Sequence, residues 1–374
     1  MKYGMMMPRK YIQGDGVFHE ISTYATLLGK KPLVVWGHHG KEAVFKVVSE
    51  SFDSARMVWE EWLFGGESTL AEAKRVESYA RETGCDLLVG LGGGKAIDTA
   101  KGVAGWMGLP VLIGPTIAAT DAPITSTAGW YNEDGIMTDI YVSKFNPDIL
   151  LVDTGVIARA PLRMFIAGLG DGITTYIESS AAYASRSTIT NRTSGLPTMA
   201  TRAIARLCFD TLMNDGIEAV RQVKQHRVTP VVERVVEAMV LHSGLGGESG
   251  GIAAAHSIAN NLPYFPENRK YFHGENVAFG VCVQLMIDDA ITCSERQRIV
   301  DWMISVELPV TLDGIGLVNF TEEKAAEFAT YCIQSPVSFF QCMVTPVTVE
   351  SLAQAILAAD DYGKWRLQTA KLVR

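Results

Sequence analysis

The sequence lacks the features that would place the protein in a membrane or outside the cell. It has no apolar run approaching the roughly 18 residues of a membrane-spanning helix. Its opening segment, MKYGMMMPRKYIQGDG, lacks the continuous apolar core of a signal peptide. The six cysteines lie far apart without a Cys-x-x-Cys pair, which argues against a disulfide framework and against a cysteine zinc site. We therefore expect a cytoplasmic protein with reduced thiols.

Charge of one sign is not concentrated anywhere in the chain either. The 33 Lys and Arg residues against 41 Asp and Glu residues give a net charge of −8, without a block of like charge. Such a chain has no electrostatic footprint for DNA or RNA, so nucleic acid is not an expected partner. The 48% hydrophobic and 20% charged fractions are those of a globular protein. At roughly 150 residues per domain, one large or two ordinary domains are expected from 374 residues.

Apolar patterns change in character at about residue 160. Before that point, short apolar runs alternate with helical patterns, which is typical of a mostly parallel sheet buried on both faces. The strands are predicted at 33–36, 56–64, 86–91, 110–114 and 148–153. After that point, apolar residues recur at spacings of three and four, and β-branched runs disappear. The sequence therefore predicts an α/β domain over residues 1–159 and an all-helical domain over residues 160–374.

The strongest local signal is a run of three glycines, Gly92-Gly93-Gly94, between a buried strand and a helix. Residues without side chains let backbone N–H groups approach a ligand, and the positive end of the helix faces that ligand. A phosphate or pyrophosphate is the natural ligand for such a loop. The run is not Gly-x-Gly-x-x-Gly, because Lys95 stands at the third glycine position, and it is not a Walker A loop. The alternative is a tight turn that binds nothing, although three glycines exceed what a turn needs.

A second polar loop, GPTIAATDAPITS at 114–126, also follows a buried strand. Its polar side chains are expected at the carboxyl end of the sheet, where ligands of open α/β folds bind. Taken alone this is a weak signal, because polar loops are common.

One acidic residue and two histidines in the second half lie among small or apolar residues. Asp171 lies in GLGDGITTYIE, just inside a predicted helix, His256 in GGIAAAHSIANNL, and His273 before a helix in YFHGENVAFG. One carboxylate and two imidazoles are an adequate ligand set for catalytic zinc with an open fourth position. The spacing cannot prove this triad, because a lone buried histidine is more often part of the core. His242 is expected in the core, and His19 and His226 at the surface.

Taken in order, GGGKAIDTAK, PTIAATDAP, GDG, AAAHS and FHGE resemble the iron-containing (group III) alcohol dehydrogenase superfamily, and within it the glycerol dehydrogenase branch. The resemblance runs from KYIQGDG near residue 10 to AADDYGKWR near the end. It implies a dehydroquinate synthase-like architecture with an N-terminal dinucleotide-binding domain and a C-terminal helical domain that carries the metal. It also implies a homo-oligomer, commonly a ring of eight subunits.

The resemblance also implies roles for particular residues. Asp171, His256 and His273 would be the zinc ligands, and Asp121 would touch the substrate. The residues that would line the cofactor are Gly93, Gly94, Lys95, Ala96, Ile97, Asp98, Thr116, Ile117, Ala118, Ala119, Thr125, Thr127 and Tyr131.

Three departures from the family pattern are informative. Iron-type relatives have a further His one helical turn after the Asp, whereas Thr175 stands there, which favours a three-ligand zinc site. The segments 258–261 (IANN) and 125–129 (TSTAG) differ from the glycerol dehydrogenase pattern near the pocket, so a substrate other than glycerol stays open. The Asp that would hold the adenosine ribose is replaced by Gly37, followed by His38, His39 and Lys41. Without that carboxylate, repulsion of a 2′-phosphate is lost, so both NAD and NADP are expected.

The sequence therefore predicts a zinc-dependent dehydrogenase that uses NAD, with NADP possible, on a small polyol or hydroxy compound. The alternatives are a hydroxycarboxylate (2-oxo acid) dehydrogenase of the same superfamily and a dehydroquinate-synthase-like lyase. The hydroxycarboxylate branch also lacks the ribose-binding Asp, but it lacks Asp121 as well. The nearly uncharged 248–262 segment argues against the lyase, and the complete Asp-His-His set argues against a non-catalytic binding protein.

Overall fold

The computed structural model describes residues 1–373 and divides the chain into two compact units. The sheet unit contains Met6–Phe165 and Arg221–Gly244, and the helical unit contains Met1–Met5, Ile166–Val220 and the chain from Leu245 onward. The single boundary predicted between residues 159 and 160 misses this interleaving.

Specific contacts explain why residues 221–244 belong to the sheet unit. Glu233 accepts hydrogen bonds from Gln13 Nε2 and from Thr154 Oγ1, both at 2.7 Å. His226 Nδ1 lies 3.0 Å from the carbonyl oxygen of Ala158. The helical pattern of this segment gave no indication of these long-range partners. At the other end, β1 (Tyr3–Gly4) joins the helical unit because it pairs with β10 (Leu196–Pro197).

The sheet unit is built on six parallel strands in the order β2-β9-β6-β5-β3-β4. Its strands are β2 (Lys10–Gly14), β3 (Pro32–Trp36), β4 (Glu60–Leu63), β5 (Leu87–Gly92), β6 (Val111–Pro115) and β9 (Ile149–Asp153). Its helical elements are η1 (Val17–Glu20), α1 (Ile21–Ala25), α2 (His38–Ser54), α3 (Leu70–Thr83), α4 (Gly94–Met107), α5 (Thr154–Arg159), α8 (Pro230–Glu237) and the π-helix η2 (Ala238–His242).

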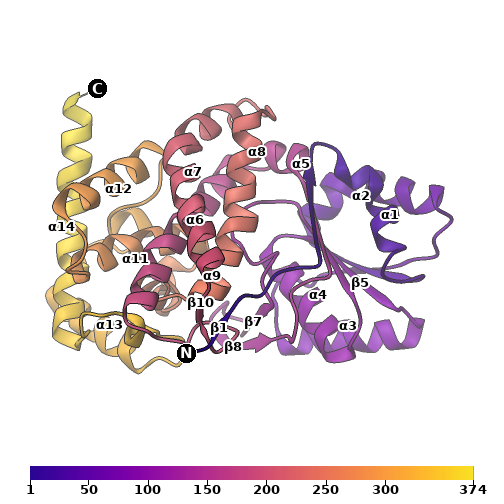
Figure 1. Cartoon of the computed structure of the whole chain (residues 1–374), viewed down its shortest axis with the longest axis horizontal. Helices are drawn as coiled ribbons and strands as arrows, with labels where there is room; N and C mark the ends of the chain where they lie inside the picture. The colour runs from indigo at the N-terminus through magenta and orange to yellow at the C-terminus, as the bar shows by residue number, and fades with distance from the viewer. Residues whose placement is uncertain (374) are drawn as a thin grey trace. The chain divides into compact units, whose positions relative to one another are not determined.

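Helices cover both faces of this sheet, as the continuous apolar strands require. Figure 1 shows α1 and α2 on one face and α3 and α4 on the other. Alternate residues of β5, such as Leu87, Val89 and Leu91, belong to the core under α1 and α2. On the opposite face Gly90 lets α4 approach, because a Cβ there would lie 2.9 Å from Ala100 Cβ.

The sequence did not predict two parts of the sheet unit. Strand β2 forms an edge of the sheet, and β7 (Thr127–Tyr131) and β8 (Met137–Val142) form a separate antiparallel hairpin. Trp130 of the hairpin packs on Trp106 of α4, with ring centroids 5.1 Å apart. The hairpin follows the 114–126 loop, so it connects that loop to α4.

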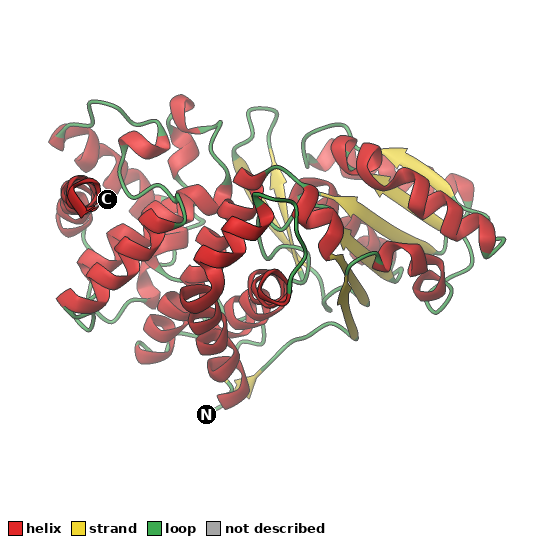
Figure 2. Cartoon of the chain, turned by 90° about the horizontal axis from the view of Figure 1, so that it is seen from above, coloured by secondary structure: helices red, strands yellow, loops and turns green. Residues whose placement is uncertain are grey.

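The helical unit contains almost no strand, as predicted (Figure 2). Its longer helices are α6 (Leu162–Ala184), α7 (Met199–Val223), α9 (Ser243–Gly250), α11 (His273–Ile287), α12 (Cys293–Ser305), α13 (Glu322–Gln334) and α14 (Val349–Val373), and the divisions between the units fall within α6, α7 and α9. Its short elements are α10 (Ala254–Ala259), η3 (Leu262–Tyr264), η4 (Pro266–Asn268), η5 (Asp313–Ile315) and η6 (Phe340–Cys342). In residues 1–373, no helix has both the length and the apolarity needed to cross a membrane. No disulfide joins any of the six cysteines, all of which lie in the described part of the chain.

Candidate active site

In the sheet unit, the glycine run lies where the order of the strands reverses. The chain passes from β3 outward to β4 and then returns to β5 on the other side of β3. Helices α2 and α4 therefore begin side by side, after Trp36 and after Gly92, at the carboxyl ends of neighbouring strands. This reversal is the place where open α/β folds bind ligands.

Glycine packs on glycine at this point. A Cβ on Gly92 would lie 3.0 Å from the Gly37 nitrogen, and a Cβ on Gly40 would lie 3.0 Å from Gly92 Cα. Neither Gly37 nor Gly93, the residues that precede α2 and α4, caps its helix with a side chain. The first N–H groups of both helices are therefore available to an anion, with the positive ends of two helix dipoles beside it.

The loop after β6 adjoins the same glycines. The Thr116 N–H donates to the Gly92 carbonyl at 3.0 Å. A Cβ on Gly93 would lie 3.0 Å from Ile117 Cδ1, and one on Gly94 would lie 3.7 Å from Thr120 Oγ1. The structure thus brings Gly93, Gly94, Thr116 and Ile117 together, and Ala118 and Ala119 continue the same loop.

The next predicted residues occupy the first turns of α4 and mostly face the protein itself. Ala96 and Ile97 are buried. The Asp98 carboxylate accepts from the Gly129 N–H at 3.0 Å and pairs with Lys101 Nζ at 3.0 Å. Burial raises the pKa of Asp98, and Lys101 and the Gly129 N–H oppose that rise. Asp98 therefore ties α4 to the hairpin.

Lys95 and Tyr131 meet at the exposed end of α4. Lys95 Nζ pairs with Glu67 and lies 4.9 Å from the centroid of the Tyr131 ring. Burial, assisted by the negative charges of Asp98 and Glu67, raises the pKa of Tyr131. Tyr131 is therefore a neutral aromatic surface beside the start of α4.

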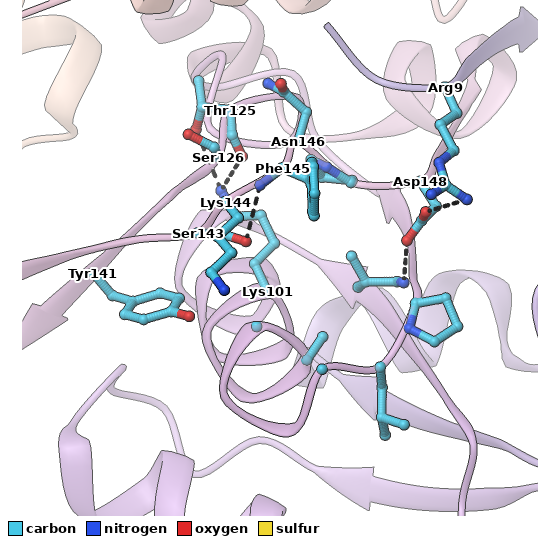
Figure 3. A pocket seen from close by; sticks show the side chains of 17 residues that line it. Arg9, Lys101, Thr125, Ser126, Tyr141, Ser143, Lys144, Phe145, Asn146 and Asp148 are labelled. Atoms are coloured by element: carbon cyan, nitrogen blue, oxygen red, sulfur yellow. Dashed lines mark hydrogen bonds and ion pairs between the residues drawn. The ribbon is translucent and has the colours of Figure 1, made fainter. Parts of the chain in front are cut away.

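Thr125 and Thr127 lie beside α4, next to Lys101 and farther from the start of the helix. Their hydroxyl oxygens are 3.1 Å apart, and both residues provide carbonyl oxygens to Lys101. Thr125 lines a cavity of about 500 Å³ at the amino-terminal ends of β6 and β9, where Arg9 pairs with Asp148 at 3.3 Å (Figure 3). This cavity lies at the opposite end of the strands from the glycine run. The cofactor role of these two threonines stays a prediction.

Asp121 has a defined partner within the sheet unit. Its Oδ2 accepts a hydrogen bond from Ser243 Oγ at 2.8 Å, and its carbonyl oxygen accepts from the Ile124 N–H at 3.1 Å. Ser243 is fully buried and follows the π-helix η2. Gly244 leaves room for the loop, because a Cβ there would collide with the Ile124 side chain. The Asp121 carboxylate is therefore held in one direction.

In the helical unit, Asp171, His256 and His273 converge. One ligand atom from each lies within 4.8 Å of the other two. Both Nε2 atoms are 3.6 Å from Asp171 Oδ1, and the two rings are 5.3 Å apart between centroids. The structure therefore brings together the three residues that the sequence singled out, and Asp171 lies well inside α6 rather than near the start of a helix.

Small residues next to the three ligands permit this convergence. Gly170 of α6 and Gly274 of α11 are in close contact, since a Cβ on either would collide with backbone of the other helix. Gly280 of α11 contacts the backbone of Ala255 of α10 in the same way. Gly170 directly precedes Asp171 in the chain, Gly274 directly follows His273, and Ala255 directly precedes His256. Close helix approach therefore sets the positions of all three ligands.

The charges around the two histidines differ. Burial lowers the pKa of His256, but the negative charges of Glu178 and Asp171 and their hydrogen bonds outweigh burial, so the pKa lies well above its ordinary value. Burial lowers the pKa of His273, and the neighbouring His256 adds to that effect while Asp171 opposes it. The side chains are 17% and 36% exposed, so the cluster is open on one side.

The sequence analysis missed two residues that contact candidate site residues. Glu178 contacts His256, and Ser243 contacts Asp121. A signal for Glu178 existed, because it follows Asp171 by seven residues and so lies on the same face of a helix two turns later. No comparable signal pointed to Ser243, since its partner lies 122 residues away.

The chain is similar to known dehydrogenases over nearly its whole length. The model of the iron-containing alcohol dehydrogenase family matches residues 8–154. Glycerol dehydrogenase from Escherichia coli O6:H1 is 37% identical over 361 residues, covering 96% of this chain and 97% of that protein. Glycolaldehyde reductase from Halobacterium salinarum is 36% identical over 364 residues, covering 96% and 97%. The crystal structure of glycerol dehydrogenase from Schizosaccharomyces pombe matches with a TM-score of 0.92 at 32% identity, covering 99% of this chain and 93% of that chain.

Proposed function

Because the chain belongs to the iron-containing alcohol dehydrogenase family and is a glycerol dehydrogenase-like polyol oxidoreductase, we propose that it oxidises a small vicinal diol or hydroxy compound with NAD or NADP. The proposal includes one zinc ion at Asp171, His256 and His273. The observation that carries it is the convergence of one buried carboxylate and two imidazoles from three helices.

The donor set suits a divalent metal. A carboxylate and two neutral imidazole nitrogens are ligands that zinc accepts, and three protein ligands leave a position for a substrate oxygen. The side chain one turn after Asp171 is Thr175, which is buried and offers no imidazole, so three ligands rather than four are available. A zinc ion held there would act as a Lewis acid and lower the pKa of a substrate hydroxyl.

The sheet unit provides the features that a dinucleotide needs. The uncapped first turns of α2 and α4 offer N–H donors to a pyrophosphate, and Gly37, Gly92 and Gly93 keep the approach free of side chains. Thr116 adds a hydroxyl beside Gly40 in the first turn of α2. A bound nicotinamide ring would accept the hydride, while these residues hold and orient the cofactor.

Asp121 is proposed to orient the second hydroxyl of a diol. A carboxylate accepts several hydrogen bonds, so Asp121 can accept from a substrate O–H as well as from Ser243 Oγ. The same negative charge would repel a substrate carboxylate, so neutral polyols are favoured over hydroxy acids.

The proposal is tested with zinc-loaded protein against diols, mono-alcohols, hydroxy acids and short hydroxyaldehydes, each with NAD(H) and NADP(H). Net formation of NADH or NADPH from a neutral diol is the expected result. Turnover of hydroxy acids alone, or a product formed without net change in the nicotinamide, would contradict it.

The structure leads us to expect relaxed cofactor choice. Gly37 offers no carboxylate at the end of β3, and His38 and His39 after it are exposed. His39 already contacts Glu42 at 3.3 Å, and Lys41 pairs with Glu61 at 2.9 Å. NADPH should therefore be used within about tenfold of NADH, a difference of about 1.4 kcal/mol. The kcat/KM values for both cofactors measure this, and a preference for NADH above a thousandfold would contradict the prediction.

Gly37→Asp should restore a preference for NADH by repelling the 2′-phosphate. Any side chain at this position brings its Cβ to 3.2 Å from Gly92 Cα, so crowding alone could alter binding. Gly37→Ala is the matched control, because it adds the same Cβ without charge. Only the Asp variant should change the ratio between the two cofactors, whereas both should share any general loss.

We also propose that the protein is a homo-oligomer, with the eight subunits that the family resemblance implies. Light scattering after size-exclusion chromatography would measure the assembled mass against the 40.7 kDa of one chain.

A further inference from the structure

The Glu178 carboxylate makes three contacts around one of the proposed metal ligands. Glu178 lies on α6, and its carboxylate is fully buried within the helical unit. Its Oε1 accepts from the backbone N–H groups of Ala253 at 2.8 Å and His256 at 2.9 Å. Its Oε2 lies 2.5 Å from His256 Nδ1. Burying a carboxylate is costly unless its oxygens are satisfied, and these three contacts provide that compensation.

These contacts determine which nitrogen of His256 faces the ligand cluster. An ionised carboxylate can only accept, so at this contact Nδ1 must carry a hydrogen. In the neutral ring, Nε2 then has its lone pair free, and Nε2 is the atom that lies 3.6 Å from Asp171 Oδ1. The backbone contacts at Ala253 and His256 hold the start of α10, so Glu178 positions both the ring and the turn that carries it.

We propose that Glu178 is a positioning residue that fixes the His256 ring in the tautomer that binds a metal through Nε2. The inference rests on the proposed metal site. Carboxylates in this arrangement raise the basicity of the ligand and hold its orientation, and their loss typically costs 10- to 100-fold in metal affinity. Among the described residues, His273 has no second carboxylate of this kind, so the effect is specific to one ligand.

Glu178→Gln isolates the tautomer from the packing. The glutamine carbonyl oxygen can still accept from the Ala253 and His256 N–H groups, so the start of α10 keeps its partners. The amide nitrogen replaces Oε2 and can only donate, so Nδ1 becomes an acceptor and the hydrogen moves to Nε2. Nε2 then cannot bind a metal without a change of tautomer. We expect at least about a tenfold rise in the zinc Kd, measured by competition with a chelator.

Glu275→Gln is the matched control. Glu275 is a buried carboxylate at the start of α11. It accepts at 2.8 Å from the N–H of Phe272, the residue before His273. In the described structure it contacts neither imidazole of the cluster. This variant removes a buried charge at a helix start without changing a tautomer. It should keep the zinc Kd of the parent protein, and the melting temperatures of both metal-free variants report any general loss of structure.

The outcomes separate this inference from the proposed function. If the parent protein binds no zinc, the metal site itself is wrong. If the parent binds zinc and folded Glu178→Gln binds it equally well, or Glu275→Gln weakens it as much, Glu178 is not a positioning residue. Should Glu178→Gln fail to fold, 15N NMR of histidine-labelled, zinc-loaded parent decides the matter. Zinc on His256 Nε2 with a hydrogen on Nδ1 supports the proposal, and zinc on Nδ1 overturns it.

Discussion

His256→Ala should lose the bound metal and nearly all activity while remaining folded. The imidazole provides one of only three ligand atoms, and the remaining carboxylate and imidazole would hold zinc weakly in an open site. We expect kcat to fall at least about 10³-fold, which corresponds to about 4.1 kcal/mol of activation free energy. Metal content per chain, kcat and the melting temperature of the metal-free protein are the three measurements.

The chain offers a control in His19, a surface histidine whose removal should change neither metal content nor kcat. Removing the metal from the parent protein with a chelator should reproduce the loss of activity, and added zinc should restore it. One tightly held zinc ion per chain in folded His256→Ala would show that the metal binds elsewhere.

Four of the five strands that the sequence predicted are buried on both faces, and the fifth, predicted at 56–64, is the half-exposed edge strand β4 (Glu60–Leu63). Residues of β3, β5, β6 and β9 are entirely buried, so their apolar runs are continuous and easily recognised. Strand β2 and the strand β8 of the hairpin are half-exposed and carry mixed residues, so neither produces such a run. Burial on both faces therefore made a strand easy to recognise, whereas membership of a sheet alone did not.

The ligand cluster could be predicted as a set of residue types but not as a geometry. Asp171 and His256 are 85 residues apart, and only the approach of α6, α10 and α11 at Gly170, Gly274 and Gly280 brings their helices together. The small residues were visible in the sequence, but their partners were not. The same is true of residues 221–244, whose contacts with Gln13 and Thr154 depend on the fold of the whole sheet unit.

Asp121→Ala should lower kcat/KM for a vicinal diol by roughly 1.5 to 3 kcal/mol, the scale of a charged hydrogen bond. The reason is that the carboxylate, held by Ser243 Oγ at 2.8 Å, is proposed to accept from the second substrate hydroxyl. A mono-alcohol has no such hydroxyl and should lose far less. The ratio of kcat/KM for the two substrates, measured with saturating cofactor, is therefore the informative quantity.

The competing explanation is that Asp121 only stabilises its own loop. Its backbone carbonyl accepts from the Ile124 N–H, and its carboxylate accepts from Ser243 Oγ. Ser243→Ala is the matched control, because it removes the same hydrogen bond from the loop and leaves the carboxylate in place. A loop role predicts that both variants lower the melting temperature alike and reduce diol and mono-alcohol turnover equally. A substrate role predicts a selective loss on the diol that is large for Asp121→Ala and smaller for Ser243→Ala, since the charge remains but is less well oriented. Equal losses on both substrates in Asp121→Ala would exclude the substrate role.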